Sequence, residues 1–197
     1  MVMAVAPHLP TPSSIRKFTA EDVWRMLDAG ILAPDEPYEL LDGELQYVSP
    51  PGPPHAKVVN RLTMAFVPVY GPGGFIVRTQ QPIGGIVDAI PEPDVAIVSI
   101  EAEEGDAHPR ADQAVLIIEV AHTSLRRDLR KGAVYAAAGA PEYWIVDVNR
   151  DLVTVYTGPN TDGTWQHATE VGLGARIRLP STDDQSIEVE RILTAAR

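Results

Sequence analysis

The sequence predicts a mixed α/β fold, in which helices flank a central mixed β-sheet. The segment VLIIEV at 115–120 is almost wholly apolar, which is typical of a central strand that is buried on both faces. Segments with helical periodicity, at 55–67 and 126–138, separate the groups of strands. The order of a helix, a hairpin, a helix, three strands, a helix and further strands favours helices packed on the faces of one sheet.

The first helix follows a capping signal. Thr19 can cap the helix and Asp22 stands at the reciprocal position, while Phe18 and Val23 occupy the two positions of a hydrophobic staple. Gly30 is a suitable C-terminal stop. We therefore predict a helix between the cap and this glycine.

A hairpin and a second helix come next. In YELLDGELQYV the Asp42-Gly43 pair stands between two alternating segments, which is a strong signal for a tight β-turn. After a proline-rich loop, residues 55–67 show one apolar face, and Pro68 is expected to help end that helix.

The remaining elements are mainly strands. We expect a helix after residue 125 with Gly139 as its stop, and an acidic solvated loop over 101–113. Short strands around 164–169 and 186–189 and a last helical turn complete the chain. The main strands are expected at 75–83, 93–100, 114–121, 143–148 and 152–157, the last two joined by a turn at 149–151.

The chain of 197 residues has the size of one domain, which we place at 15–197 after a disordered leader at 1–14. The leader has no basic segment followed by an apolar core, so it is unlike a secretory signal, and no apolar run is long enough for a membrane helix. The absence of cysteine excludes disulfides, thiolate zinc sites and a cysteine nucleophile. It fits a reducing compartment, and we expect a cytoplasmic protein.

The formal net charge of −11 argues against a broad basic surface for nucleic acid. One local basic cluster remains, formed by Arg126, Arg127, Arg130 and Lys131.

Carboxylates at particular positions indicate a metal site. Asp94 opens a strand directly after Pro93, and Glu119 lies inside the apolar strand, where a charge is costly unless it is paired or holds a cation. Two such carboxylates side by side suit Mg²⁺ or Mn²⁺, which prefer oxygen ligands. The alternative is that Asp94 caps a strand and Glu119 pairs with a buried arginine. Glu39, Glu44 and Asp88 are the other carboxylates that stand out by position.

Other polar and aromatic residues are weaker candidates. His55 opens the second helix and can bind a phosphate or accept a proton, although packing or capping is the more common role. Gln80 and Gln81 fall near a strand end, with Gln81 and Arg127 as candidate substrate contacts. Tyr135, Tyr143 and Trp144 fit the core better than base stacking. The chain has neither a G-x-S-x-G nucleophile elbow nor a phosphate-binding glycine loop.

Several segments together carry a resemblance to a known family. YELLDGEL, SPPGPPHAKVVNRL, EPDVAIV, the long LIIEVAHTSLRRDLRKGAVYAAAGAPEYWIVD and LVTVY resemble the Uma-two family of endonucleases, a branch of the PD-(D/E)XK superfamily. The resemblance implies a restriction-endonuclease-like core, with Pro93-Asp94 as the PD element and Glu119 as the acidic residue of (D/E)xK.

The same resemblance assigns further roles and meets one departure. The superfamily lysine would share the face of Glu119 at residue 121, where this chain has Ala121. Lys131 is the replacement candidate, because relatives carry a similar D-x-x-K step and Asp128 stands three residues before it. Its role would be to stabilise the phosphate or orient the attacking water. The alternative is an exposed lysine paired with Asp128. Glu44 matches the DGE(L/I) element and is preferred to Glu39 as a third metal-shell residue.

The resulting hypothesis is a metal-dependent endonuclease that hydrolyses DNA in preference to RNA and acts as a homodimer or higher homo-oligomer. Two alternatives stay open: an inactive nuclease-fold interaction or regulatory module, favoured by Ala121 and the acidic charge, and a metal hydrolase of a small phosphate ester.

Overall fold

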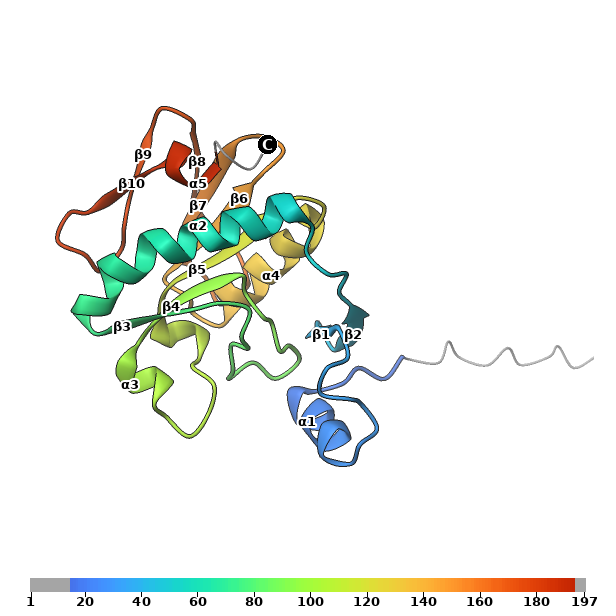
Figure 1. Ribbon diagram of the computed structural model, residues 1–197. Helices are drawn as coiled ribbons and strands as arrows, with labels where there is room; N and C mark the ends of the chain where they lie inside the picture. The colour runs from blue at the N-terminus through green and yellow to red at the C-terminus, as the bar shows by residue number, and fades with distance from the viewer. Residues whose placement is uncertain (1–14, 194–197) are drawn as a thin grey trace, which may run out of the picture.

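The computed structural model describes residues 15–193, so the predicted leader and the last four residues lie outside the described part. A six-stranded mixed sheet in the order β3-β4-β5-β6-β7-β8 forms its centre (Figure 1). Its strands are β3 (Phe75–Arg78), β4 (Val95–Ser99), β5 (Ala114–Ala121), β6 (Glu142–Asp147), β7 (Leu152–Pro159) and β8 (Trp165–Gly172). The mixed α/β architecture predicted from the sequence is confirmed.

The smaller elements lie around this sheet. Two two-stranded sheets pair β1 with β2 and β9 with β10. The helices are α1 (Ala20–Asp28), α2 (Pro53–Tyr70), α3 (Ile100–Glu103), α4 (Leu125–Ala137) and α5 (Val189–Leu193), with single 3₁₀ turns η1 (Gly71–Gly73) and η2 (Ala111–Gln113); the short strands are β1 (Tyr38–Leu41), β2 (Glu44–Tyr47), β9 (Arg176–Arg178) and β10 (Ser186–Glu188).

Helices cover both faces of the central sheet. Alternate residues of β5 point to opposite sides, so Leu116 and Ile118 pack with α2 and α5, while Ile117 and Ala121 pack on the side of α4. This two-sided burial explains the almost wholly apolar sequence of the strand. Because side chains alternate along a strand, Glu119 points to the same side as Ile117 and Ala121, and residues of α4 are therefore near it.

The predicted local signals at the N-terminal end are confirmed. Thr19 and Asp22 form the reciprocal capping box of α1, at 3.1 and 3.0 Å. Asp42 and Gly43 both take positive φ, at 52° and 74°, as the tight turn between β1 and β2 requires.

The segment 101–113, predicted as a solvated loop, instead contains part of α3 and all of η2, where Ala102 and Ala111 are buried. The ends of two predicted elements are also wrong. Pro68 lies inside α2, which continues to Tyr70, because Phe66 and Tyr70 are buried in the core and hold the last turn against the sheet. The strand predicted at 75–83 ends at Arg78, since Gln80 takes a φ of 50° and turns the chain away from the sheet. Tertiary packing and one backbone conformation override the sequence pattern at these points.

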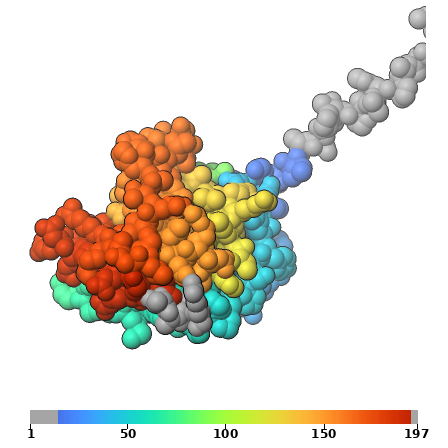
Figure 2. Space-filling view, turned by 90° about the horizontal axis from the view of Figure 1, so that it is seen from above, coloured from blue at the N-terminus to red at the C-terminus, as the bar shows by residue number. Residues whose placement is uncertain are grey.

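The C-terminal strands reach beyond the body of the protein. β8 is mostly exposed, and the orange end of the β7–β8 hairpin projects from the body (Figure 2). Within residues 15–193, no helix has the length and apolar character needed to cross a membrane.

Candidate active site

A pocket of about 480 Å³ opens at the end of β5, between the β1–β2 hairpin and the first turns of α2 and α4. Its wall includes side chains that the sequence analysis singled out, among them His55, Asp94, Glu119, Arg127 and Lys131. The proline-rich segment after β2 completes the rim. Elements far apart in sequence therefore converge on one concave surface.

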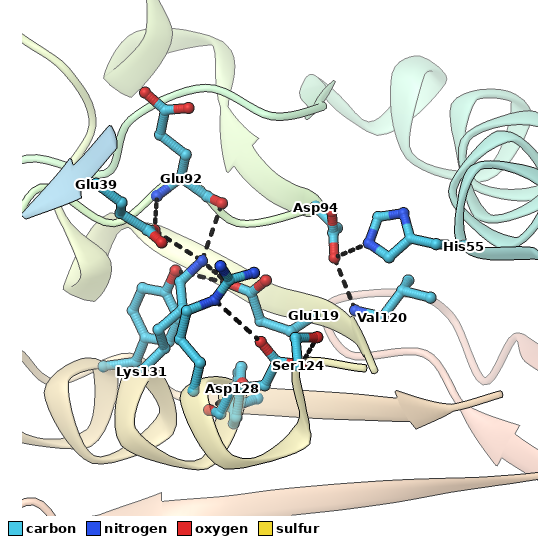
Figure 3. A network of polar contacts seen from close by, with 12 residues as sticks. Glu39, His55, Glu92, Asp94, Glu119, Val120, Ser124, Asp128 and Lys131 are labelled. Carbon is cyan, nitrogen blue, oxygen red and sulfur yellow. Dashed lines mark hydrogen bonds and ion pairs between the residues drawn. The ribbon is translucent and has the colours of Figure 1, made fainter. Parts of the chain in front are cut away.

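Asp94, directly before β4, is held by two hydrogen-bond donors. Its Oδ2 accepts hydrogen bonds from the backbone N–H of Val120, at 2.8 Å, and from His55 Nε2, at 2.9 Å. Because β4 pairs with β5 through Val95 and Ile118, Asp94 is next in register to Glu119 (Figure 3). Asp94 and Glu119 are thus neighbours in the sheet, as expected.

Lys131 lies at the centre of a buried ionic cluster. Its Nζ is 2.7 Å from Glu119 Oε1 and 2.8 Å from Glu39 Oε1, and it donates to the carbonyl oxygen of Glu92 at 3.0 Å. The side chain is only 2% exposed. The alternative of an exposed lysine paired with Asp128 is therefore wrong. The three oxygens use all three N–H donors of the ammonium group.

Glu39, and not Glu44, is the hairpin carboxylate in the cluster. Glu39 is buried and also accepts a hydrogen bond from the backbone N–H of Glu92 at 2.8 Å. Glu44 is exposed and pairs with Leu41 beside the turn, two residues nearer the hairpin tip. Two residues along a strand correspond to roughly 7 Å, so Glu44 stands outside the pocket. The preference for Glu44 was wrong.

α4 supplies a stripe of polar side chains to the cluster. Tyr135 donates its hydroxyl hydrogen to Glu119 Oε1 at 3.0 Å, and Ser124 donates to Asp128 Oδ2 at 2.6 Å. Asp128, Lys131 and Tyr135 follow at spacings of three and four, which place them on one helical face. Tyr135 is buried as predicted, but its hydroxyl has a role in the site that sequence reasoning missed. The spacing from Lys131 was the available signal.

Burial of several carboxyl groups around one ammonium group, that of Lys131, shifts the pKa values in the site. Burial raises the pKa of Glu119 well above its ordinary value, against the opposing effect of Lys131. Burial also acts to lower the pKa of Lys131, but Glu119 and Glu39 outweigh it and raise that pKa above its ordinary value. Burial likewise raises the pKa of Asp128 and of Glu92, the latter with a contribution from Glu39. The ammonium group therefore stays charged and is shared by two carboxylates.

Comparison with known proteins places the sequence of this chain in a family. The sequence profile of Uma2, described as "Putative restriction endonuclease", matches residues 21–190. This chain belongs to the Uma2 family. The family resemblance seen in the sequence is thereby confirmed.

Solved structures support the fold of this Uma2 protein. A crystal structure described as "a putative nuclease belonging to DUF820" from Anabaena variabilis ATCC 29413 matches with a TM-score of 0.73 and 14% identity, over 91% of this chain and 99% of that chain. The type IIG restriction endonuclease BpuSI matches with a TM-score of only 0.36 and 16% identity, over 57% of this chain and 13% of that chain. No curated protein sequence matches.

The remaining predicted contacts divide into two groups. His55 and Arg127 line the pocket of the Uma2 protein, and His55 is also hydrogen-bonded to Asp94. Gln81 does not line it; Gln80 does, because its positive φ turns that residue inward while its N–H donates to the carbonyl of Pro93 at 3.0 Å. Choosing Gln81 was therefore an error of one residue.

The local basic cluster is not maintained in the folded protein. Lys131 is buried among carboxylates, and Arg130 turns to the hairpin, where it contacts Asp42 Oδ2 at 2.6 Å. Arg127 also lines the pocket but, unlike Lys131, stays partly exposed. A helix distributes consecutive side chains around its axis, so neighbours in sequence separate in space.

The donor set fits a divalent cation with few protein ligands. Val120 and His55 occupy Asp94 Oδ2, and Lys131 and Tyr135 occupy Glu119 Oε1, so each carboxylate keeps a second oxygen for a cation. Mg²⁺ commonly binds through one or two carboxylates and retains several waters. Among residues 15–193, however, no group of three or more histidine or acidic side chains is arranged to hold a metal. The geometry fits a two-carboxylate site, without the Glu44 ligand expected from the sequence.

Proposed function

We propose that this Uma2 protein is a metal-dependent endonuclease that hydrolyses phosphodiester bonds in DNA. The observation that carries the proposal is the pair of carboxylates, Asp94 and Glu119, which open into one pocket beside the buried ammonium group of Lys131. Membership of a family described as "Putative restriction endonuclease", and a fold shared with a protein described as "a putative nuclease", support phosphodiester chemistry.

The two carboxylates are the proposed ligands and correspond to the acidic residues of a PD-(D/E)XK site. A bound Mg²⁺ or Mn²⁺ would supply an activated water and offset negative charge on the phosphate. The protein fixes the ligands before metal arrives: the Val120 N–H and His55 orient Asp94, while Lys131 and Tyr135 orient Glu119. Such preorganisation is what neighbours of metal ligands contribute.

Lys131 has two proposed roles: it positions the carboxylates, and it can donate to the substrate phosphate. In the structure its three N–H donors contact Glu39, Glu119 and the carbonyl of Glu92, so it positions the carboxylates and adds a positive charge near the phosphate. Direct donation to the phosphate, which is the usual task of the superfamily lysine, requires release of one of these contacts. Charge near the developing oxyanion stabilises the transition state in either case.

Arg127 is the proposed contact for the substrate phosphate. Its side chain is 31% exposed, it lines the pocket, and its Nε is buried without a hydrogen-bond partner in the described part of the chain. Asp128 Oδ1 lies 4.0 Å from that Nε, close enough to orient the guanidinium group but too far for a hydrogen bond. A guanidinium group with free donors suits a phosphate oxygen.

The deciding experiment follows nicking of supercoiled plasmid with Mg²⁺ or Mn²⁺, for the wild type and for Asp94→Asn and Glu119→Gln. We expect nicking that needs the metal and is lost in both variants, whereas Glu101→Gln, on the exposed surface of α3 and outside the pocket, nicks like the wild type. Calorimetric titration with Mn²⁺ should show binding that both variants lose. A wild type that neither binds Mn²⁺ nor nicks DNA refutes the proposal. Parallel assays with RNA and with bis-p-nitrophenyl phosphate distinguish DNA cleavage from RNA cleavage and from hydrolysis of a small ester.

Two observations favour the second candidate, an inactive nuclease-fold module. The Lys131 ammonium group already neutralises charge between Glu39 and Glu119, and residues 15–193 hold no three-ligand cluster. This function predicts wild-type folding of Asp94→Ala and no heat of Mn²⁺ binding.

Sedimentation of the intact protein, with and without DNA, tests the further proposal that the nuclease acts as a homodimer or larger homo-oligomer.

A further inference from the structure

Two smaller hollows lie next to the active-site pocket, and residues of α1 line part of each. The first has a volume of about 280 Å³ and shares Tyr38, Glu39 and Glu92 with the wall of the active-site pocket. The second, of about 220 Å³, shares Trp24 and His108 with the first. Neighbouring hollows therefore adjoin one another, and we call the two smaller ones together the groove.

An aromatic pair stands where the two smaller hollows meet. The Trp24 and His108 rings stack at 5.9 Å between centroids and 28° between planes. Trp24 is 40% exposed and His108 is exposed, although a tryptophan usually buries most of its ring. Pro82 and Ile90 complete the apolar wall that both hollows share.

The charges of the groove exclude one mode of nucleic-acid binding. Neither smaller hollow has a lysine or arginine in its wall, and the first carries Glu36, Glu39 and Glu92. Such a surface cannot grip a phosphate backbone, which is what binding to a duplex mainly requires. It can receive the uncharged face of a base, which stacks on aromatic side chains irrespective of sequence.

We propose that this groove binds unstacked nucleobases of a single-stranded nucleic acid whose phosphodiester lies at Asp94 and Glu119. The inference rests on the proposed nuclease function and narrows its substrate to single strands or frayed ends. Base faces are covered by their neighbours inside a duplex and are accessible only when a strand is unpaired. The low overall basicity agrees with a substrate that is held by stacking over a short length, since only a few phosphates need contact.

The test measures binding of a fluorescent oligothymidylate by anisotropy, with Ca²⁺ in place of Mg²⁺ and a gel to verify that the strand stays intact. The probes are the single strand, its duplex with oligoadenylate, and the same single strand with abasic sites. We expect the intact single strand to bind tightest, because only it offers base faces. Trp24→Ala should weaken that binding roughly five- to hundredfold, Trp24→Phe should restore most of it, and neither change should affect the abasic strand.

Met64→Ala is the matched control, because Met64 is 78% exposed on α2 and lies outside all three hollows. Circular dichroism checks the fold, and His108→Ala replaces Trp24→Ala if that variant does not fold. Equal binding of duplex and single strand, unchanged binding in the variants, or no binding of the single strand overturns the inference. Tight, Trp24-dependent binding without any cleavage in Mg²⁺ refutes the nuclease proposal alone.

Discussion

Lys131 on α4 places its Nζ 2.7 Å from Oε1 of Glu119 on β5, and both side chains are almost completely buried. This ion pair links the strand that carries the proposed metal ligand to the helix that follows it. Because Glu39 shares the same ammonium group, the cluster also ties the β1–β2 hairpin to the central sheet. The contact is at once a structural link and the centre of the proposed site.

Removing the ammonium group should be costly for the fold. Lys131→Met leaves Glu39 and Glu119 buried without an opposite charge, and loss of one member of a buried ion pair typically costs about 3–5 kcal/mol of unfolding free energy. Urea unfolding monitored by circular dichroism measures the change. The triple variant with Glu39→Gln and Glu119→Gln should recover part of the loss, since it has no unpaired charge. A Lys131→Met protein as stable as the wild type contradicts the ionic account of the cluster.

The two hairpin carboxylates should differ in their effect on activity. Glu39→Gln weakens the hold on Lys131, and loss of a group that supports metal ligands commonly costs about 10- to 100-fold in activity. Glu44→Gln, on the exposed side of the turn, should leave plasmid nicking unchanged. The ratio of the two kcat/KM values is the measurement. Equal losses in both variants would show that the whole hairpin, rather than Glu39, supports catalysis.

Gly132 should tolerate no side chain, although it lies within a helix. A Cβ at this position would meet Cε1 of Tyr143 at 2.7 Å, and that ring is buried and stacked against Trp165. Overpacking costs about 1–3 kcal/mol, which exceeds the gain of about 1 kcal/mol in helix propensity. Thermal unfolding should show Gly132→Ala less stable than the wild type. In Gly71→Ala, where no atom lies within 4 Å, stability should be unchanged or higher.

Glu142 should give the protein a pH-dependent stability far from the site. Burial raises its pKa above the unfolded value of 4.5, while the hydrogen bond from Trp144 opposes the shift. A raised pKa means that its favourable contribution is present below pH 4.5 and is lost as pH rises through the folded value. Glu142→Gln does not titrate, so its stability relative to the wild type should increase as pH rises from 4.5 through the folded value and then stay constant.

Urea unfolding over a series of pH values provides the measurement for Glu142→Gln. Glu101→Gln is the control with the opposite sign, because hydrogen bonds from its own backbone and from Ser99 lower the pKa of Glu101. The contribution of Glu101 is therefore present above pH 4.5 and lost as pH falls through the folded value. A constant difference between Glu142→Gln and the wild type would contradict the burial argument.

The sequence predicted the local elements well where local chemistry controls them. The capping box of Thr19 and Asp22, the Asp42-Gly43 turn and the stop at Gly139, which takes a φ of 82°, depend on residues a few positions apart. The sequence was less informative where distant packing decides, as at Pro68, which the buried end of α2 accommodates. The acidic pair Asp94 and Glu119 was also predictable, because a carboxylate beside or within an apolar strand is conspicuous.

By itself, the sequence determined most of the central strands, the helices α1, α2 and α4, the two strand-associated carboxylates and the family to which the chain belongs. Only the tertiary structure decided that Glu39 rather than Glu44 joins Lys131, that Gln80 rather than Gln81 faces the pocket, and that the basic residues of α4 separate. These choices depend on which side of a turn or helix faces the sheet once distant segments pack together. Such an orientation is set by the burial of the whole chain, and a pattern of neighbouring residues does not contain it.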